Sequence, residues 1–176
     1  MNNLVEISKR LSYLLRHNHE DLIMDNQGYV DVDALLNKIH ISFDDLDHIV
    51  STNDKKRFAY NDDKTKIRAS QGHTMDVKID FKPMIPPDIL YHGTDDKGYH
   101  GIMKTGISRM SRQYVHLSDN EKTAYSVGKR YSKAKQPIIL IIDALSMYND
   151  GLIFFKSENN VWLTDNVPIK YITKKE

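Results

Sequence analysis

The beginning of the chain carries hydrophobic residues at helical spacing. Between positions 4 and 17, leucine and isoleucine recur every three or four residues, while lysine, arginine and serine occupy the other side. This pattern predicts an amphipathic helix at residues 4–17 with one buried face. Two more helices are expected, one that contains residues 34–39 with Asp31 or Asp33 as its N-cap, and one at residues 42–50.

Strand-like segments follow these helices. Residues 57–60 and 65–69 bracket the turn-rich sequence 61–64, which predicts a β-hairpin, and a short strand is expected at residues 29–32. Helices followed by a hairpin are the order of a winged-helix-like module, whose hairpin commonly contacts nucleic acid. The alternative is a solvated, charged hairpin without a ligand.

A proline-rich segment separates this module from the rest of the chain. Residues 82–88 hold three of the five prolines, and proline restricts both its own backbone and that of the preceding residue. The predicted domains are a winged-helix-like lobe at residues 1–82, a stiff linker at 83–88 and a second lobe at 89–176. We expect an α+β fold overall.

The second lobe is predicted to be rich in strands. The β-branched run at residues 138–142 indicates a strand that is buried on both faces. Helices are expected at residues 97–105 and up to Val127, the latter capped by Ser118 or Asp119. Further strands are expected at residues 89–92, 114–117, 153–155, 161–163 and 171–172.

Composition narrows the class of protein. The chain has 176 residues, with 25 Lys+Arg against 24 Asp+Glu, which argues against a bulk polyelectrolyte binder but allows local basic patches. The absence of cysteine excludes disulfides, Fe–S clusters, thiol nucleophiles and zinc–thiolate sites. No apolar run approaches the ~20 residues of a membrane span, and no secretory leader is evident, so we expect a cytoplasmic protein.

Cationic side chains in the first lobe are candidates for binding phosphate. Arg16 and His17 end the first predicted helix, where cations also complement the helix dipole. Between residues 53 and 73, lysines and arginines outnumber aspartates six to three, and a glycine-containing loop ends at His73. The guanidinium groups of Arg16 and Arg68 would suit a dianionic phosphate.

A metal is not expected in the first lobe. His17 and His19 form a His-x-His pair, but no third ligand is evident nearby.

In the second lobe, His92-Gly93-Thr94 follows a predicted strand directly. A glycine there lets a ligand approach the backbone, although a tight turn explains it equally well. His116 lies inside a predicted strand, where a histidine is more often a core residue, and Arg112 and Arg130 fit a solvent-exposed role. The chain has no Rossmann glycine fingerprint, P-loop or nucleophile elbow.

Several segments carry a resemblance when they are taken in order. They are residues 8–17, 28–36, 56–58, 67–73, 90–94, 115–118, 127–130 and 161–164. This ordered set resembles the RNA 2′-phosphotransferase family, the KptA-type tRNA 2′-phosphotransferases. The resemblance implies an N-terminal winged-helix RNA lobe and a C-terminal lobe with the ADP-ribosyltransferase fold.

The resemblance also implies the reaction and its substrates. An internal RNA 2′-phosphate, of the kind left by tRNA splicing, attacks NAD⁺ and expels nicotinamide. The ADP-ribosylated phosphate then yields RNA with a free 2′-hydroxyl and ADP-ribose 1″,2″-cyclic phosphate. NAD⁺ is consumed as a co-substrate, no metal is expected, and the oligomeric state is open, with a monomer favoured.

By motif, the resemblance assigns three sets of residues. The catalytic set is Arg16, His17, Arg68 and Arg130, with Arg112 as the alternative to Arg130. The NAD⁺-binding set is His92, Gly93, Thr94, His116, Ser118 and Val161. The RNA- or phosphate-binding set is Arg57, Lys66, Gln71, His73 and Arg112.

Two departures from the family pattern and two alternative functions remain. Asn159-Asn160 replaces the usual Asn-Gly, and because asparagine tolerates positive φ we expect the turn to persist. Residues 131–136 replace a short His-Gly connection after Arg130, which leaves the choice between Arg130 and Arg112 open. The alternatives are an ADP-ribosyltransferase that modifies a nucleic-acid terminal phosphate or a protein, and a non-catalytic RNA-binding module.

Overall fold

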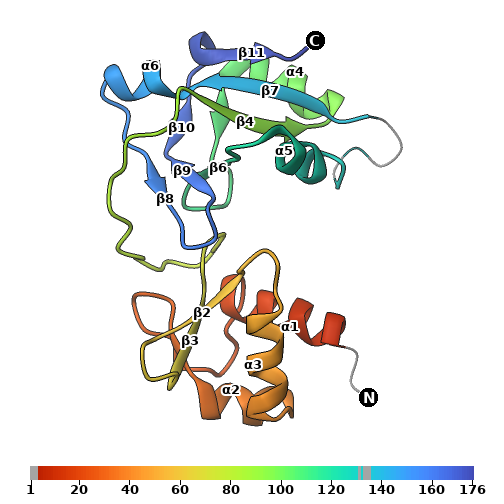
Figure 1. Cartoon of the computed structure of the whole chain (residues 1–176), viewed down its shortest axis with the longest axis vertical. Coiled ribbons are helices and arrows are strands. Elements are labelled where there is room, and N and C mark those ends of the chain that lie inside the picture. Colours follow the sequence, from red (N-terminus) through yellow and green to blue (C-terminus); the bar gives the residue numbers. More distant parts are fainter. Residues whose placement is uncertain (1–3, 131, 133–135) are drawn as a thin grey trace. The chain divides into compact units, whose positions relative to one another are not determined.

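The structure, a computed structural model, describes residues 4–130, 132 and 136–176. The chain divides into two compact units, Met1–Asp80 (unit 1) and Phe81–Glu176 (unit 2). Helices and small antiparallel sheets occur in both units (Figure 1), which confirms the mixed α and β content predicted from the sequence. The likeness of the two units to a winged helix and to an ADP-ribosyltransferase stays a prediction.

Unit 1 combines helices with a small sheet, in the order expected from the sequence. Its elements are α1 (Leu4–Arg16), β1 (Val30–Asp31), α2 (Val32–Ile39), α3 (Phe43–Ser51), β2 (Phe58–Tyr60) and β3 (Lys66–Ala69). The strands form an antiparallel sheet in the order β1-β3-β2. The three predicted helices and the predicted hairpin are confirmed.

Local chemistry explains where these helices begin. The side chain of Asp31 accepts a hydrogen bond from the Ala34 amide (2.8 Å), and the Ser42 hydroxyl accepts one from the Asp45 amide (3.1 Å). Each bond satisfies a backbone donor that the first turn of a helix leaves unpaired. Of the two caps considered for α2, Asp31 is therefore the one used.

The apolar face of α1 packs into a core shared by the helices and the sheet of unit 1. Leu11, Leu14 and Leu15 are fully buried, at the spacing that the sequence predicted. The other buried members are Leu22, Val30, Val32, Leu35, Leu46, Ile49, Phe58, Ile67 and Ala69. This core fixes the C-terminal end of α1 and the middle of β3 within one unit.

Unit 2 is built from short strands and helices around a second core. Its elements are β4 (Ile89–Thr94), α4 (Asp96–Thr105), β5 (Ile107–Ser108), β6 (Val115–Leu117), α5 (Glu121–Gly128), β7 (Ile138–Asp143), α6 (Ala144–Asn149), β8 (Phe155–Lys156), β9 (Trp162–Thr164), β10 (Asn166–Val167), η1 (Ile169–Tyr171) and β11 (Ile172–Lys174). The antiparallel sheets have the orders β11-β7-β4, β6-β9-β8 and β10-β5.

Strand β7 is the centre of the first of these sheets. Leu140 and Ile142 are fully buried, whereas Ile138 and Ile141 are half-buried, so burial on both faces is only partly realised. Strand β4 pairs with β7 along all six of its residues, from Ile89 to Thr94. A β-bridge between Tyr91 and Ser118 connects β4 to the end of β6.

Some details of unit 2 differ from the sequence-based expectations. The N-cap of α5 is Asn120, whose side chain accepts a hydrogen bond from the Thr123 amide (2.9 Å), so both predicted caps, Ser118 and Asp119, are wrong. The strand expected at residues 153–155 begins only at Phe155. Elements β5, β10 and α6 were not expected.

The proline-rich segment is hydrogen-bonded to the rest of unit 2. The Met84 amide donates to the Phe154 carbonyl (2.8 Å), and the Asp88 carbonyl accepts from the Ala144 and Leu145 amides (3.0 and 3.2 Å). These bonds fix both ends of the segment, in addition to the stiffness that proline supplies.

No helix in the described ranges is long and apolar enough to span a membrane.

Candidate active site

Unit 1 gathers four of the predicted site residues into one cationic cluster. Arg16 is the last residue of α1, His17 follows it, Arg68 lies within β3 and His73 lies in the loop beyond that strand. Burial, and after it the positive charges of Arg16, Arg68 and His17 in that order, lower the pKa of His73 from 6.5 to about 4. Arg16, Arg68 and His17 each lie close enough to the His73 ring to act on its pKa.

His73 is the most deeply buried member of the cluster. Its side chain is 2% exposed, and its Nε2 atom has no hydrogen-bond partner among the described residues. Gly28, at φ +82°, lies against it, because a Cβ at this position would stand 3.3 Å from Nε2. The lowered pKa keeps the imidazole neutral at pH 7, so the ring adds no positive charge to the cluster.

Arg68 is held in place by an aromatic ring. It is only 9% exposed, and the centre of its guanidinium lies 4.6 Å from the centroid of the Tyr29 ring. A cation–π contact of this kind restricts the plane of the guanidinium. The preceding residue in β3, Ile67, is part of the core, so the strand anchors Arg68 through its neighbour.

Thr74 ties the loop after β3 to the end of α1. Its amide donates to the Arg16 carbonyl (2.9 Å), and its hydroxyl Oγ1 lies 3.1 Å from Nδ1 of His17. Neither Thr74 nor Tyr29 was predicted to be a site residue. Thr74 stands beside the motif residue His73, and Tyr29 lies within the resemblance segment 28–36, but neither signal indicates a contact with the cluster.

The other predicted RNA-contacting residues of unit 1 are more dispersed. Arg57 precedes β2, and its carbonyl accepts a hydrogen bond from the Ser70 amide (2.9 Å). Lys66 is exposed and its Nζ lies 3.4 Å from Asp25, while Gln71 is half-buried in the loop after β3. Their role in RNA binding stays a prediction.

Unit 2 places the predicted NAD⁺-contacting histidines next to each other. Nδ1 of His92 lies 3.3 Å from the His116 carbonyl, which can only accept, so His92 donates there and its Nε2 is left as an acceptor. Burial lowers the pKa of His92, the bond to His116 opposes this shift, and the nearby charge of Arg112 adds to it. His92 is therefore neutral at pH 7.

Arg112 contacts His116 directly. Its Nη1 donates to Nδ1 of His116 at 2.5 Å, which leaves the proton of a neutral His116 on Nε2. His116 is half-buried. Ser118 pairs with Tyr91 through both backbone groups, at 2.8 and 2.9 Å, which fixes the segment after β6 beside β4.

Arg130 stands at a different kind of position. It is exposed just after α5, and its amide donates to the Val127 carbonyl (3.2 Å). In the sequence 131–136 that follows, residues 131 and 133–135 lie outside the described residues. The assignment of the fourth arginine to Arg130 or Arg112 stays a prediction.

Gly93 has a packing role in unit 2. A Cβ at this position would stand 1.9 Å from the Ala124 carbonyl oxygen and 2.9 Å from the Gly128 amide. The space beside Gly93 is therefore occupied by the backbone of α5. This contact explains the residue type without a ligand.

The turn before β9 forms as expected. Asn160 adopts φ +61°, the left-handed conformation for which asparagine is suited. The Ser157 hydroxyl donates to the Val161 carbonyl (3.0 Å) and accepts from the Val161 amide (3.1 Å). The substitution of asparagine for the family's usual glycine thus preserves the turn that presents Val161.

Comparison with known proteins identifies the family. Buried arginines beside a histidine are typical of sites that bind phosphate. A model of the family described as RNA 2′-phosphotransferase, Tpt1 / KptA family, matches residues 2–166. The chain belongs to this RNA 2′-phosphotransferase family, which confirms the resemblance seen in the sequence and supports a transferase with an RNA substrate.

Similar proteins come from several bacteria. A probable RNA 2′-phosphotransferase of Flavobacterium johnsoniae is 49% identical to this chain over 176 residues, covering 96% of this chain and 95% of that protein. Proteins with the same name from Trichormus variabilis and Fusobacterium nucleatum are each 45% identical, covering 96% and 98% of this chain and 94% and 99% of their own lengths. The similarity thus extends over nearly the whole chain.

Proposed function

We propose that this protein transfers an internal RNA 2′-phosphate to NAD⁺. The RNA phosphate attacks the anomeric carbon of the nicotinamide ribose, and the C–N bond to nicotinamide breaks. The 2″-hydroxyl of the same ribose then attacks the phosphorus, and the RNA 2′-oxygen leaves and takes up a proton. The products are RNA with a 2′-hydroxyl, nicotinamide and ADP-ribose 1″,2″-cyclic phosphate. A splicing-derived tRNA in the cytoplasm is the proposed natural substrate.

The cationic cluster of unit 1 is the observation that carries this proposal. Arg16 and Arg68 supply guanidinium groups that bind a dianionic phosphate through charge-assisted hydrogen bonds. Because His73 stays neutral at pH 7, these arginines provide the positive charge. A phosphate is already nucleophilic at this pH, so positioning is the main requirement of the first step.

The second step places a different demand on the same side chains. Negative charge builds up on a five-coordinate phosphorus, and arginines stabilise such a transition state. His17, hydrogen-bonded to Thr74, is placed to orient the phosphate or to assist proton transfer. The fourth arginine of the proposed catalytic set is Arg130, with Arg112 as the alternative.

Unit 2 has the donor and acceptor groups that NAD⁺ needs. Nε2 of neutral His92 can accept a hydrogen bond, and Nε2 of His116 can donate one. Thr94, Ser118 and the backbone at Val161 complete the proposed NAD⁺-contacting set together with Gly93. NAD⁺ supplies the electrophilic carbon, and no metal is proposed.

A direct assay tests the proposal. The protein is incubated with NAD⁺ and a short RNA that bears one internal 2′-phosphate, and both products are identified by mass. We expect a cyclic phosphate of ADP-ribose and an RNA lighter by one phosphate. A lasting ADP-ribosylated RNA without cyclic phosphate would favour the alternative transferase, and salt-dependent RNA binding without NAD⁺ turnover would favour the binding module.

Variants of the cluster test the site separately. Arg16→Ala and Arg68→Ala are expected to abolish turnover while the protein remains folded, as judged by circular dichroism. Arg68→Lys keeps the charge but loses the planar fork that stacks on Tyr29, so we expect kcat to fall at least ~10-fold. Full activity of the two alanine variants would contradict the site assignment.

A further inference from the structure

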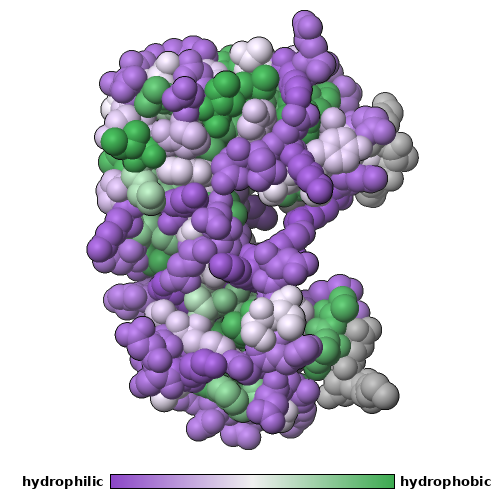
Figure 2. Space-filling model, viewed as in Figure 1, coloured by the Kyte–Doolittle hydropathy of each residue, from purple (hydrophilic) through white to green (hydrophobic). Residues whose placement is uncertain are grey.

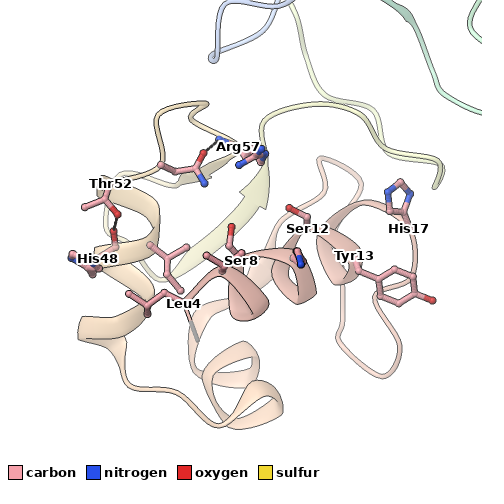
Figure 3. A pocket seen from close by; sticks show the side chains of 12 residues that line it. Leu4, Ser8, Ser12, Tyr13, His17, His48, Thr52 and Arg57 are labelled. Carbon is pink, nitrogen blue, oxygen red and sulfur yellow. Dashed lines mark hydrogen bonds between the residues drawn. The ribbon is translucent and has the colours of Figure 1, made fainter. Parts of the chain in front are cut away.

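Unit 1 contains a groove of which only one lining residue, His17, takes part in the proposed phosphate chemistry. The groove has a volume of about 550 Å³ and is formed by α1, by the end of α3 and by the segment leading into β2 (Figure 3). The lining residues are Leu4, Val5, Ser8, Lys9, Ser12, Tyr13, His17, His48, Ile49, Thr52, Asn53 and Arg57. All of them belong to unit 1.

One face of α1 forms a whole wall of this groove. Each turn contributes two adjacent residues, first Leu4 and Val5, then Ser8 and Lys9, then Ser12 and Tyr13. This is the helical repeat of 3.6 residues, on a face other than the buried leucine face. The next turn of this face leads to His17, so the groove ends at a member of the cationic cluster.

The opposite wall is supplied by α3 and the chain that follows it. His48, Ile49 and Thr52 come from α3 and its C-cap, and Asn53 accepts a hydrogen bond at Oδ1 from the Arg57 amide (3.3 Å). Figure 3 shows Arg57 facing the same space as the serines of α1. The groove thus runs from the start of α1 to His17 between two fixed walls.

The side chains of the groove suit a nucleotide strand. Its cationic members are Lys9 and Arg57, two histidines also line it, and among its described lining residues there is no aspartate or glutamate. Tyr13 is 49% exposed, and the centroid of its ring lies 6.3 Å from that of His17. Figure 2 shows both hydrophobic and hydrophilic surface on unit 1. At the start of α1, the hydrophobic residues Leu4 and Val5 are 40% and 61% exposed.

We propose that this groove binds a nucleotide of single-stranded RNA that flanks the 2′-phosphate. The base stacks on Tyr13, the backbone phosphate contacts Arg57 and Lys9, and the hydroxyl groups of Ser8 and Ser12 hydrogen-bond the ribose or the base. This inference rests on the proposed function, because it takes the phosphate bound beside His17 as the fixed point from which the strand extends.

The chemistry favours RNA over other occupants. The volume falls within the range of about 300–1,000 Å³ of small-molecule sites, which accommodates one nucleotide. Sequence-tolerant recognition of single strands combines cationic contacts to the backbone with aromatic stacking, and both features occur here. An acidic peptide would use the cations but leave the exposed tyrosine ring without a role.

Substrates of two lengths test the proposal. One is a 2′-phosphorylated RNA with several nucleotides on both sides of the modified residue, and the other is a 2′-phosphorylated mononucleotide, which has no flanking nucleotide. Tyr13→Ala removes the stacking surface, and Ser8→Trp fills the groove two turns away from His17. For the long RNA we expect both variants to raise KM about tenfold with little change in kcat. Turnover of the mononucleotide, which does not extend into the groove, should be unchanged.

Tyr148→Ala is the matched control, because Tyr148 is a half-exposed tyrosine on α6 in unit 2 (38% exposed). It is expected to behave as the unaltered protein with both substrates. Equal losses on long and short substrates, or no loss with Ser8→Trp, would overturn the groove assignment.

Direct binding separates this inference from the proposed function. Fluorescence anisotropy with the long RNA needs no NAD⁺ and no turnover. If the unaltered protein binds the RNA but does not react, the proposed function fails, and the groove is still judged by the loss of affinity in Tyr13→Ala and Ser8→Trp. Unchanged affinity in both variants would overturn the groove assignment.

Discussion

A neutral imidazole among cations is the most unusual residue-scale feature of this protein. His73 is buried beside Arg16, Arg68 and His17, and its pKa is lowered to about 4. A protonated ring there would add charge to a site already positive and cut off from water. The neutral ring therefore lowers the free energy of unfolding only at a pH low enough to protonate this histidine in the unfolded chain.

The pH dependence of stability tests this state of His73. Above pH 6.5 the ring is neutral in folded and unfolded protein, so it adds no pH dependence. Between 6.5 and about 4 the unfolded chain binds a proton that the folded protein does not, so the free energy of unfolding falls as the pH falls. At pH 5 we expect a loss of about 2 kcal/mol.

Urea titrations at pH 7 and pH 5 measure this loss. His73→Asn provides the comparison, since carboxylates that titrate at low pH are common to both proteins. The variant should lose about 2 kcal/mol less than the unaltered protein between the two pH values. Identical pH dependence in the two proteins would show that the pKa of His73 in the folded protein is close to its ordinary value of 6.5.

Motif order in the sequence identified the cluster residues, but not what orients them. Arg16, His17 and Arg68 were recognisable because their residue types suit a phosphate. Tyr29 and Thr74 were not, since a stacking ring and a clamping hydroxyl depend on contacts between segments distant in sequence. The spacing of motifs does not show which residues from distant segments are in contact.

At the scale of elements, the contact between β4 and α5 depends on two glycines. Gly93 on β4 and Gly128 at the end of α5 face each other so closely that each would clash with added side-chain atoms. A helix can approach a strand to this distance only where both lack a Cβ. The position of α5 on the sheet is therefore set by residue size.

Gly93→Ala should destabilise unit 2 strongly. The added Cβ would stand 1.9 Å from a backbone oxygen that cannot move without displacing α5, and we expect a loss of about 3 kcal/mol. Gly101→Ala on α4 is the matched control, because nothing lies within 4 Å of its Cβ position. It should gain about 0.5–1 kcal/mol from helix propensity. Thermal unfolding followed by circular dichroism measures both.

The turn before β9 offers a second test at this scale. Asn160→Val places a β-branched residue at φ +61°, and we expect it to lose about 1–2 kcal/mol of stability. Asn160→Gly should be neutral or slightly stabilising, because glycine adopts this conformation without strain. Equal stability of the two variants in chemical denaturation would contradict the conformational argument.

Long periodic elements were predictable from sequence, and short ones were not. Helix α1 and the β2–β3 hairpin follow from repeated apolar spacing and a clear turn. Strands β5 and β10 have two residues each, too few for any periodicity. Helix α6 begins directly after β7 at Asp143, whose side chain caps it (3.1 Å to the Ser146 amide), so no loop separates the two elements in the sequence.

For the whole molecule, a net charge of +1 limits how RNA can be held. Binding cannot depend on a general positive field, so it has to come from local cations such as those of the groove and the cluster. Four phosphate contacts, matching Arg16, Arg68, Arg57 and Lys9, would release about 3 counterions from a single strand. The protein should therefore show moderate salt dependence.

Anisotropy titrations over a salt series measure this slope. For single-stranded RNA we expect log K to fall with log[salt] with a slope of about −3. Double-stranded DNA of equal length is the comparison and should bind much more weakly. A slope of about −7 would instead indicate a broad electrostatic surface.

The chain's division into a helix-rich and a strand-rich half followed from composition and pattern. What the sequence could not supply was the pairing of strands from distant segments, since β9 reaches β6 and β11 reaches β7 only after long connections. The motifs of the family resemblance are spread over nearly the whole chain. Their order therefore identified the family better than any single motif could.

Strand β4 is joined to β7 along its full length and to Ser118 through Tyr91. Adding or deleting one residue within it would shift both partnerships together and turn alternate side chains to the opposite face. His92 and Thr94 would then exchange surroundings with their neighbours. Apart from Gly93, this stretch should consequently accept conservative changes of side chain but never a change of length, and a homologue with a gap here would have lost the arrangement altogether.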